Sequence, residues 1–312
     1  MLILLASLAV LLILGIPIAY AIGLSSILFF ALNHPDLVQI LPQRMFAGFN
    51  SYTLIALPLF ILMGFLMNEA GITAKLINFC QLFVGRFRGG LGLVNVGASM
   101  IFGGISGSSA ADTSSIGSIL IPMMKKDGYD ADFATTVTMA SSVQGILIPP
   151  SHNMIIFALV AGSVSIGRLF LAGMIPGILL GIALMIYSYF VSVKRNYPKS
   201  DRFRLGEALR SFADAGLGLG TVIIVVVGVV AGVFTATESA AIAVIYAFVI
   251  TFFVYKEIPL RAVNGILTRS LKTLSVVMIL VSTASAFGWL VAYLTSGALV
   301  DEVGGFLEET FG

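Results

Sequence analysis

Long apolar stretches, separated by short polar segments, run along the whole chain. They occupy residues 1–31, 52–67, 165–193, 217–233, 235–255 and 274–294. Residues 33–51 are expected to be a polar connection after the first of them. Runs of this kind are typical of helices that cross the ~30 Å hydrocarbon core of a bilayer. The strands of a membrane β-barrel would instead alternate apolar and polar residues. The pattern therefore predicts an all-α polytopic membrane protein.

Residues 89–124 depart from this pattern, although they are nearly all apolar or small and contain one charge, Asp112. A straight helix of this length would measure about 54 Å, which exceeds the hydrocarbon core. Residues 103–115 are rich in Gly, Ser and Thr, which disfavour a helix interior. Basic residues flank both ends, namely Arg86, Arg88, Lys125 and Lys126. Since basic residues collect on the cytoplasmic side, we expect a re-entrant helical hairpin that enters and leaves there.

A second interruption falls within the apolar span 130–160. Pro149 and Pro150 are consecutive there, so two backbone donors are missing and the preceding turn is pushed out of the helical region. This predicts a helix broken near midspan. Irregular backbone at membrane depth persists only where protein buries it or where it lines a watery cavity. The hairpin tip and this break are therefore the candidate binding site.

The order of the segments predicts an inverted repeat, since two spans and an interfacial helix recur late in the chain with opposite orientation. Residues 1–86 would hold scaffold helices and an amphipathic interfacial arm, and 87–160 the hairpin and broken helix of a transport domain. Residues 161–233 would form connecting helices with a basic cytoplasmic loop. Residues 234–312, with a short amphipathic piece at 296–312, would begin a second repeat whose hairpin lies beyond the chain. Counting spans from the basic loop places the N-terminus in the cytoplasm.

Composition narrows the function classes. The chain has 312 residues, of which 58% are hydrophobic and only 10% charged, whereas soluble domains carry about 25% charged residues. No basic cluster interleaved with aromatic residues indicates nucleic-acid binding. Cys80 is the single cysteine and His34 and His152 lie far apart, so neither a disulfide, a transition metal nor an organic cofactor is expected.

The two interruptions offer ligands for an ion. Carbonyl groups at the C-terminal ends of half-helices bind cations, and N–H groups at N-terminal ends attract carboxylates. We expect Na⁺, as a co-transported ion, between the tip and the backbone of the break. The expected ligands are Ser106, Gly107, Ser109, Gly145, Ile148 and Pro149. The alternative is that both interruptions are packing kinks made by small residues.

Two acidic residues within apolar segments have competing interpretations. Asp112 either binds a cation or proton or caps the outgoing hairpin arm, and we favour the cap. Thr235 and Glu238 fit a capping box, which we favour over a role for Glu238 at a domain interface.

An enzyme hypothesis rests on Gly104-Ile105-Ser106-Gly107, the G-x-S-G pattern of rhomboid intramembrane serine proteases. Ser106 would be the nucleophile and His152 the base. A short motif of small residues is a weak signal in a chain with 33 glycines, so we expect no enzyme.

Several motifs spread along the chain resemble one transporter family. They are Ala56-Leu57-Pro58-Leu59-Phe60-Ile61-Leu62-Met63-Gly64, Ile105-Ser106-Gly107-Ser108-Ser109, Ile121-Pro122-Met123-Met124, Ile148-Pro149-Pro150-Ser151, Pro176-Gly177 and Gly232-Val233-Phe234-Thr235-Ala236-Thr237-Glu238-Ser239-Ala240. Together they resemble the large membrane subunit of tripartite ATP-independent periplasmic (TRAP) transporters.

The resemblance implies Na⁺-driven import of organic acids, such as C4-dicarboxylates or sialic acids, across the bacterial inner membrane. It implies two partners, a periplasmic substrate-binding protein and a small four-helix membrane subunit, and an elevator motion of the hairpin domain against a fixed scaffold. By resemblance, Ser106 to Ser109 with Gly145 to Pro149 would hold Na⁺. Ser108, Ser151 and Asn153 would face the substrate. The alternative is a stand-alone Na⁺/anion symporter of similar build.

Overall fold

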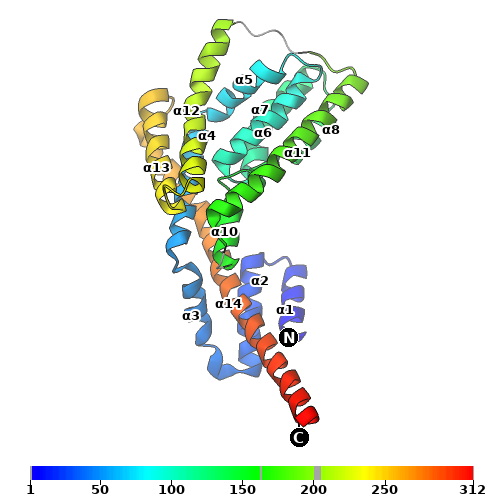
Figure 1. The fold of residues 1–312 in the computed structure, drawn as a ribbon, viewed down its shortest axis with the longest axis vertical. Coiled ribbons are helices and arrows are strands. Elements are labelled where there is room, and N and C mark those ends of the chain that lie inside the picture. The colour runs from blue at the N-terminus through cyan, green and yellow to red at the C-terminus, as the bar shows by residue number, and fades with distance from the viewer. Residues whose placement is uncertain (1, 162–163, 200–204, 312) are drawn as a thin grey trace. The chain divides into compact units, whose positions relative to one another are not determined.

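A computed structural model describes residues 2–161, 164–199 and 205–311, without the side chains of 205–210 and 297–311, and its elements are helical (Figure 1). Among these described residues, five helical segments are long and apolar enough to cross a membrane, and a bent pair makes a sixth. The five are Tyr52–Glu69, Ile166–Lys194, Ser211–Val230, Ala236–Tyr255 and Leu260–Ser296. This arrangement confirms the prediction of an all-α polytopic membrane protein.

The chain divides into two compact units, and the smaller consists of residues 1–51 and 272–312. It contains α1 (Leu2–Ile13), α2 (Ile18–Asn33), α3 (Ile40–Phe49) and the later part of α14 (Val263–Phe311). Its apolar core is built around Leu4, Phe30, Leu41 and Leu290. The Phe30 ring stacks on Trp289 with centroids 6.3 Å apart, so this unit has a core of its own.

Three predictions in the smaller unit are wrong. Residues 1–31 form two helices, α1 and α2, which pack on each other, because Gly15 takes a left-handed φ of +78° and Pro17 cannot continue α1. The expected polar connection 33–51 contains the helix α3. The expected separate piece 296–312 is continuous with the span before it, since α14 runs unbroken for 49 residues.

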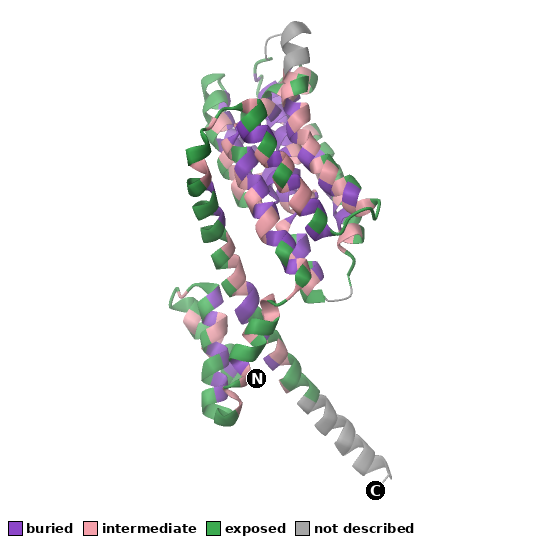
Figure 2. Ribbon diagram, turned by 90° about the vertical axis from the view of Figure 1, so that its left-hand side faces the viewer, coloured by how far each residue is buried: buried purple, intermediate pink, exposed green. Residues whose placement is uncertain are grey.

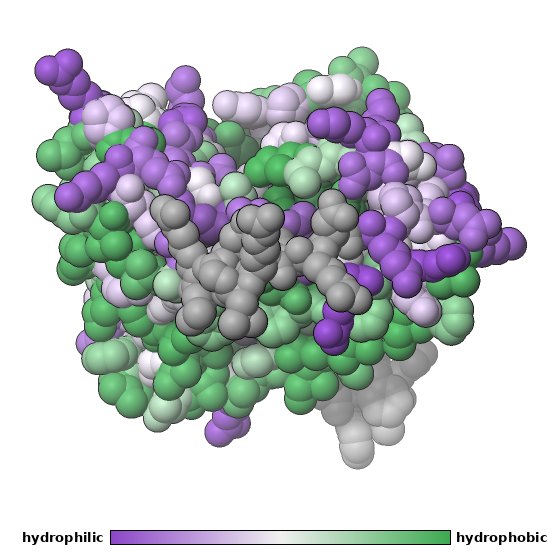
Figure 3. All heavy atoms as spheres, turned by 90° about the horizontal axis from the view of Figure 1, so that it is seen from above, coloured by the Kyte–Doolittle hydropathy of each residue, from purple (hydrophilic) through white to green (hydrophobic). Residues whose placement is uncertain are grey.

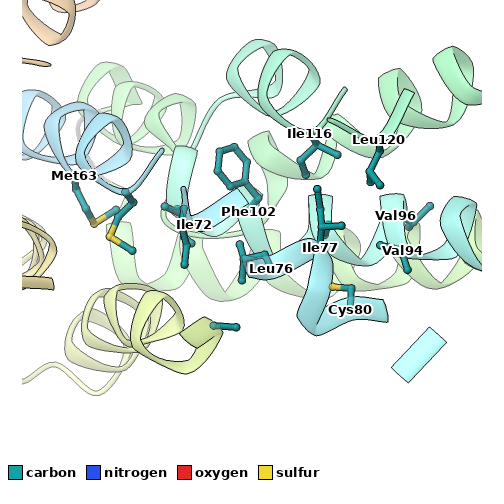
Figure 4. Close-up of a cluster of buried hydrophobic side chains, with 14 of the residues drawn as sticks. Met63, Ile72, Leu76, Ile77, Cys80, Val94, Val96, Phe102, Ile116 and Leu120 are labelled. Carbon is teal, nitrogen blue, oxygen red and sulfur yellow. The ribbon is translucent and has the colours of Figure 1, made fainter. Parts of the chain in front are cut away.

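The larger unit comprises residues 52–271. Its main helices are α4 (Ala56–Glu69), α5 (Ile72–Val84), α6 (Gly90–Ser106), α7 (Ser109–Lys126), α8 (Ala131–Ser142), α9 (Gln144–Leu147), α10 (His152–Ala161), α11 (Ile166–Lys194), α12 (Leu205–Val230) and α13 (Ala236–Val249). Figure 2 shows that its inner helical faces are buried. Figure 4 shows part of this core, in which side chains of α5, α6 and α7 meet.

The amphipathic helix predicted before the hairpin is α5. Ile72 and Leu76 are buried against the core, whereas Phe83, at the far end of the same stripe, is 54% exposed. The apolar spacing therefore identifies a helix that packs on the hairpin.

The capping box at the start of α13 is confirmed. The Thr235 Oγ1 accepts the Glu238 N–H at 3.3 Å, and the Glu238 Oε2 accepts the Thr235 N–H at 2.8 Å. Reciprocal bonds of this kind satisfy two backbone donors that the first turn leaves free. Past Val249 the span continues as the π-helical segment η3 (Ile250–Tyr255).

The loop 195–199, which follows α11, joins the foot of the hairpin to the start of α8. The Gly89 N–H donates to the Pro198 carbonyl at 3.1 Å. The Arg195 Nη1 lies 2.6 Å from the Asp130 Oδ2, and the Tyr197 hydroxyl donates to the same oxygen at 2.7 Å. These bonds tie α11 to the entry of α6 and to the N-terminal end of α8.

Aromatic packing covers the same junction. The Tyr197 ring contacts the rings of Tyr129 and Phe133, at centroid distances of 4.4 and 5.2 Å. The Tyr129 hydroxyl accepts the Leu91 N–H at 3.3 Å, within the first turn of α6. Tyr129 and Tyr197 are both 5% exposed, so the aromatic part of the junction is buried, whereas the Asp130 and Arg195 side chains beside it are 55% and 41% exposed.

The carboxyl group of Asp130 predicts a pH-dependent contribution to stability. The hydrogen bond from Tyr197 and the bond from Arg195 lower its pKa. A lowered pKa stabilises the fold above the unfolded value of about 3.9, and the contribution is lost as pH falls through the folded pKa. We expect Asp130→Asn to lower the unfolding temperature at pH 7, with the difference from wild type shrinking as pH falls below about 3.9 and vanishing below the lowered pKa of the folded state. Thermal unfolding followed by intrinsic fluorescence measures this, with Asp127→Asn as the control. An Asp130→Asn deficit that persists unchanged at pH 3 would contradict the assignment.

Candidate functional site

The hairpin tip is a two-residue turn between α6 and α7. Gly107 ends α6 with a φ of +61°, a left-handed conformation that glycine adopts without strain. Ser108 follows with extended backbone, and its side chain accepts the Ala111 N–H at 3.4 Å as the N-cap of α7. The first arm therefore ends where the sequence predicts, but the second begins three residues before Asp112.

The predicted helix break is also present. The helix made by α8 and α9 stops at Leu147, and α10 restarts at His152 with a bend of 43°. Between them, Pro149 and Pro150 have no N–H to offer to the preceding turn. The last carbonyl groups of α9 and the first N–H groups of α10 thus lack the usual helical partners.

The tip packs on the break by backbone-to-backbone contact. The His152 N–H points at the Gly107 carbonyl, 3.4 Å away. A Cβ placed on Gly107 would lie 2.9 Å from the Pro150 carbonyl oxygen, and one on Gly104 would lie 2.9 Å from that of Pro149. A carbonyl contact that close is below van der Waals separation, so only glycine allows this approach.

Further along the same contact, Gly103 of α6 packs against Gly145 of α9. A Cβ on Gly103 would lie 2.7 Å from the Gly145 Cα, and a Cβ on Gly145 would lie 3.3 Å from the Ser108 carbonyl oxygen. The structure therefore brings the two predicted irregular segments together, with main-chain oxygens of both facing the junction.

The residues predicted to hold Na⁺ lie at this junction. Ser106, Gly107, Gly145 and Pro149 are buried, and Ser109 and Ile148 are half-buried. The Ser106 hydroxyl lies 3.4 Å from both the Ser108 carbonyl oxygen and the Ser108 amide nitrogen. Hydroxyl and carbonyl oxygens are hard ligands, so the donor set suits a small cation and needs no carboxylate.

The residues predicted to face a substrate differ in how far they are buried. Ser108 is half-buried at the tip. Ser151 is fully buried in the break, and its hydroxyl has no hydrogen-bond partner. Asn153 is exposed on the first turn of α10. Ser108 and Ser151 adjoin the Gly107–Pro150 contact, whereas Asn153 forms no hydrogen bond with the tip in the part of the chain that the structure describes.

Sequence reasoning missed a polar interface between the hairpin and α8. The Ser142 hydroxyl pairs with those of Ser109 and Thr113 at 3.1 and 2.7 Å. Deeper in, the Asn95 amide donates to the Thr138 hydroxyl at 2.6 Å, and the hydroxyls of Ser99 and Ser141 lie 3.0 Å apart. A signal was present in the sequence: Asn95 and Ser99, and likewise Thr138 and Ser142, are four residues apart. This spacing places each pair on one face of its helix.

The interpretation of Asp112 as a helix cap is wrong, because Ser108 fills that position. Asp112 lies one turn later, is fully buried, and neither carboxylate oxygen has a hydrogen bond of good geometry, although Ser99 interacts with the carboxyl group. Gln144, at the start of α9, is likewise buried with both amide atoms unpaired. Such groups are costly to bury, so the stability of the fold does not account for their burial without partners.

The geometry does not support the protease hypothesis. Both hydrogen bonds of the Ser106 hydroxyl are with the Ser108 backbone, and none joins it to His152 among the described residues. A nucleophile needs its base within hydrogen-bond reach.

The sequence is similar to a family of known transporters. The family described as "Tripartite ATP-independent periplasmic transporter, DctM component" matches residues 5–307. The sialic acid TRAP transporter large permease protein SiaM of Vibrio cholerae is 39% identical over 89% of this chain and 65% of its own length. The C4-dicarboxylate TRAP transporter large permease protein DctM of the same species is 42% identical over 78% of this chain and 54% of its own.

A third relative is the 2,3-diketo-L-gulonate TRAP transporter large permease protein YiaN of Escherichia coli. It is 34% identical over 93% of this chain and 68% of its own length. The chain thus spans roughly half to two thirds of the relatives it matches. These relatives are permeases and not enzymes, and the chain belongs to the DctM family, the large membrane component of TRAP transporters.

Proposed function

We propose that this protein is the large permease of a Na⁺-coupled importer of small organic acids in the bacterial inner membrane. The observation that carries the proposal is the backbone contact between the hairpin tip and the helix break. Two unwound segments supply carbonyl groups for a cation and helix N-termini for a carboxylate side by side. The names of the relatives, which specify sialic acid, C4-dicarboxylates and 2,3-diketo-L-gulonate, support a substrate of this class.

In this proposal Na⁺ lies among the oxygens of Ser106, Gly107 and Ser109 from the tip and those of Gly145, Ile148 and Pro149 from the break. The tip would contribute hydroxyl oxygens and the oxygens of its last helical carbonyl groups as ligands of the ion. The substrate carboxylate would then be bound beside the ion by Ser108, Ser151 and Asn153, at the N-terminal ends of α7 and α10. Placing cation and anion together offsets the cost of holding either away from water.

The packing around the site supports the proposed elevator motion. A Cβ on Gly173 would lie 2.6 Å from the Leu147 carbonyl oxygen, and one on Gly177 would lie 2.7 Å from Ile148. With loop 195–199 holding its far end, α11 is closely packed on the broken helix and the hairpin, which supports the view that they move together. The proposed partners are a periplasmic binding protein that delivers the substrate and a small four-helix membrane subunit, with the N-terminus of the permease in the cytoplasm.

Uptake measurements test the coupling. We expect proteoliposomes holding the intact permease with its small membrane subunit to accumulate the acid only with an inward Na⁺ gradient and the binding protein. Sialic acid, succinate and 2,3-diketo-L-gulonate are the probes, and replacing Na⁺ by K⁺ is the control. Full uptake in K⁺ would contradict Na⁺ coupling, and full uptake without the binding protein would favour a stand-alone symporter.

A bulky side chain at the tip tests the site itself. We expect Ser108→Trp to reduce uptake to background, because the indole ring would occupy the space between the tip and the break. Membrane insertion should be unchanged, as judged by the yield of folded protein in size-exclusion chromatography. The matched control is Ser118→Trp, on an exposed face of α7. Normal uptake by the Ser108→Trp protein would remove the tip from the binding site.

The glycine contact gives a stability prediction. Gly103→Ala should lower the free energy of unfolding by about 1–3 kcal/mol, as overpacking does, since its Cβ would meet the Gly145 backbone at 2.7 Å. Gly216→Ala, in α12, is the control, because its Cβ would meet nothing within 4 Å, and it should stabilise by up to about 1 kcal/mol. Chemical denaturation in detergent measures both. Equal stability of the two variants would show that the tip and the break do not touch.

A further inference from the structure

An apolar crevice opens beside the foot of the hairpin, away from the proposed substrate site. It has a volume of about 390 Å³, within the range of pockets that hold small ligands. One wall is the turn between α5 and α6, and the other is the last part of α11. The lining residues are Val84, Phe87, Leu93, Met185, Ile186, Tyr189 and Phe190.

The crevice is accessible from outside the protein. Phe190 is 66% exposed and Ile186 52% exposed, although both are apolar and belong to a span of high hydropathy. On a membrane protein, such a surface faces hydrocarbon. The crevice therefore offers a place for an acyl chain and not for a water-soluble ligand.

Three cations stand at one mouth of the crevice. Arg86 and Arg88 flank the lining residue Phe87 in the chain. Lys194 follows Ile186 and Phe190 at intervals of four residues on α11, so Lys194 lies on the same helix face as these two lining residues. All three cations are exposed, and none has a carboxylate within 4 Å among the described residues, whereas neighbouring Arg195 is paired with Asp130.

The positions of the two arginines suit a headgroup at this level. The Arg86 guanidinium lies over the Phe87 ring, 5.3 Å from its centroid. The Arg88 Nη1 donates to the Asn196 Oδ1 at 3.3 Å, which fixes its direction and leaves further N–H groups free. Figure 3 looks down on this end of the larger unit and shows hydrophilic side chains gathered there, with hydrophobic ones on the flanks.

We propose that this crevice is a binding site for an anionic phospholipid, with one acyl chain along Phe87, Ile186 and Phe190 and the phosphate bound by Arg86, Arg88 and Lys194. The argument is charge complementarity: an unpaired basic rim beside an apolar slot matches a lipid with a negative headgroup, and basic pockets between membrane helices bind such headgroups. A zwitterionic lipid could place its acyl chain in the crevice but would not neutralise the three cations. The proposal does not depend on Na⁺ coupling or on the substrate.

Native mass spectrometry of the intact permease tests the proposal. Phosphatidylglycerol and phosphatidylcholine with identical acyl chains are titrated into the protein in detergent. We expect wild type to prefer phosphatidylglycerol. Each Gln replacement at Arg86, Arg88 or Lys194 should weaken phosphatidylglycerol binding about fivefold, and the triple variant should bind both lipids equally. The matched control, Lys125→Gln/Lys126→Gln, removes exposed cations at the end of α7 and should keep the preference.

A second variant tests the slot separately from the charges. Ile186→Trp fills the crevice and leaves every cation in place, so phosphatidylglycerol binding should fall about tenfold, as expected for the loss of several buried methylene groups. Thermal unfolding in phosphatidylcholine checks that each variant is folded. Glycerol phosphate, which has the headgroup without chains, should not displace the lipid at millimolar concentration.

Several outcomes would overturn the proposal. Unchanged lipid preference in the triple variant would exclude the three cations, and unchanged binding by Ile186→Trp would exclude the crevice. Equal losses in the triple variant and the Lys125→Gln/Lys126→Gln control would indicate diffuse electrostatic attraction. Displacement by glycerol phosphate would indicate a site for free phosphate. Loss of the lipid on adding the small membrane subunit would show that a protein occupies this surface.

Discussion

A backbone that leaves helical geometry within a membrane has to find partners for its N–H and C=O groups. In this permease the two irregular segments meet that need together. The turn at Gly107 and the break at Pro149 and Pro150 lie against each other at main-chain distance. Glycine at positions 103, 104, 107 and 145 is what allows the approach. The same groups that need partners in the folded protein are the ones that the proposed ion and acid would contact.

The surrounding helices hold this contact in place. Hydroxyl pairs join α7 to α8, and an amide–hydroxyl pair joins α6 to α8. At the opposite end, the loop 195–199 binds the entry of the hairpin and the start of α8 through Tyr197 and Arg195. Hairpin, broken helix and α11 are thus connected at both ends.

Three of the buried polar side chains without partners, among the residues that the structure describes, lie near this contact. Asp112, Gln144 and Ser151 are fully buried, yet their side-chain oxygens lack hydrogen bonds of good geometry. Each would be a liability in a purely structural core. They lie in α7, in α9 and in the break, the segments that surround the proposed site. The lipid crevice lies elsewhere, on the outer face at the foot of the hairpin, and uses apolar and cationic side chains in place of backbone.

The sequence alone determined the parts that depend on local chemistry. Apolar run length identified the spans, Pro149 and Pro150 the break, glycine and serine the tip, and Thr235 with Glu238 a cap, because each follows from near neighbours in the chain. The predicted Na⁺ residues gathered at one junction, although their role stays a prediction. Only the tertiary structure decided that residues 1–31 fold back on themselves and that Asp112 is a buried group and not a cap. It also placed Asn95 and Ser142 in the polar interface between the hairpin and α8. The close approach of Gly103 to Gly145 was likewise visible only in the tertiary structure. These depend on which helices pack together, and hydropathy does not record the partner that a helix face will meet.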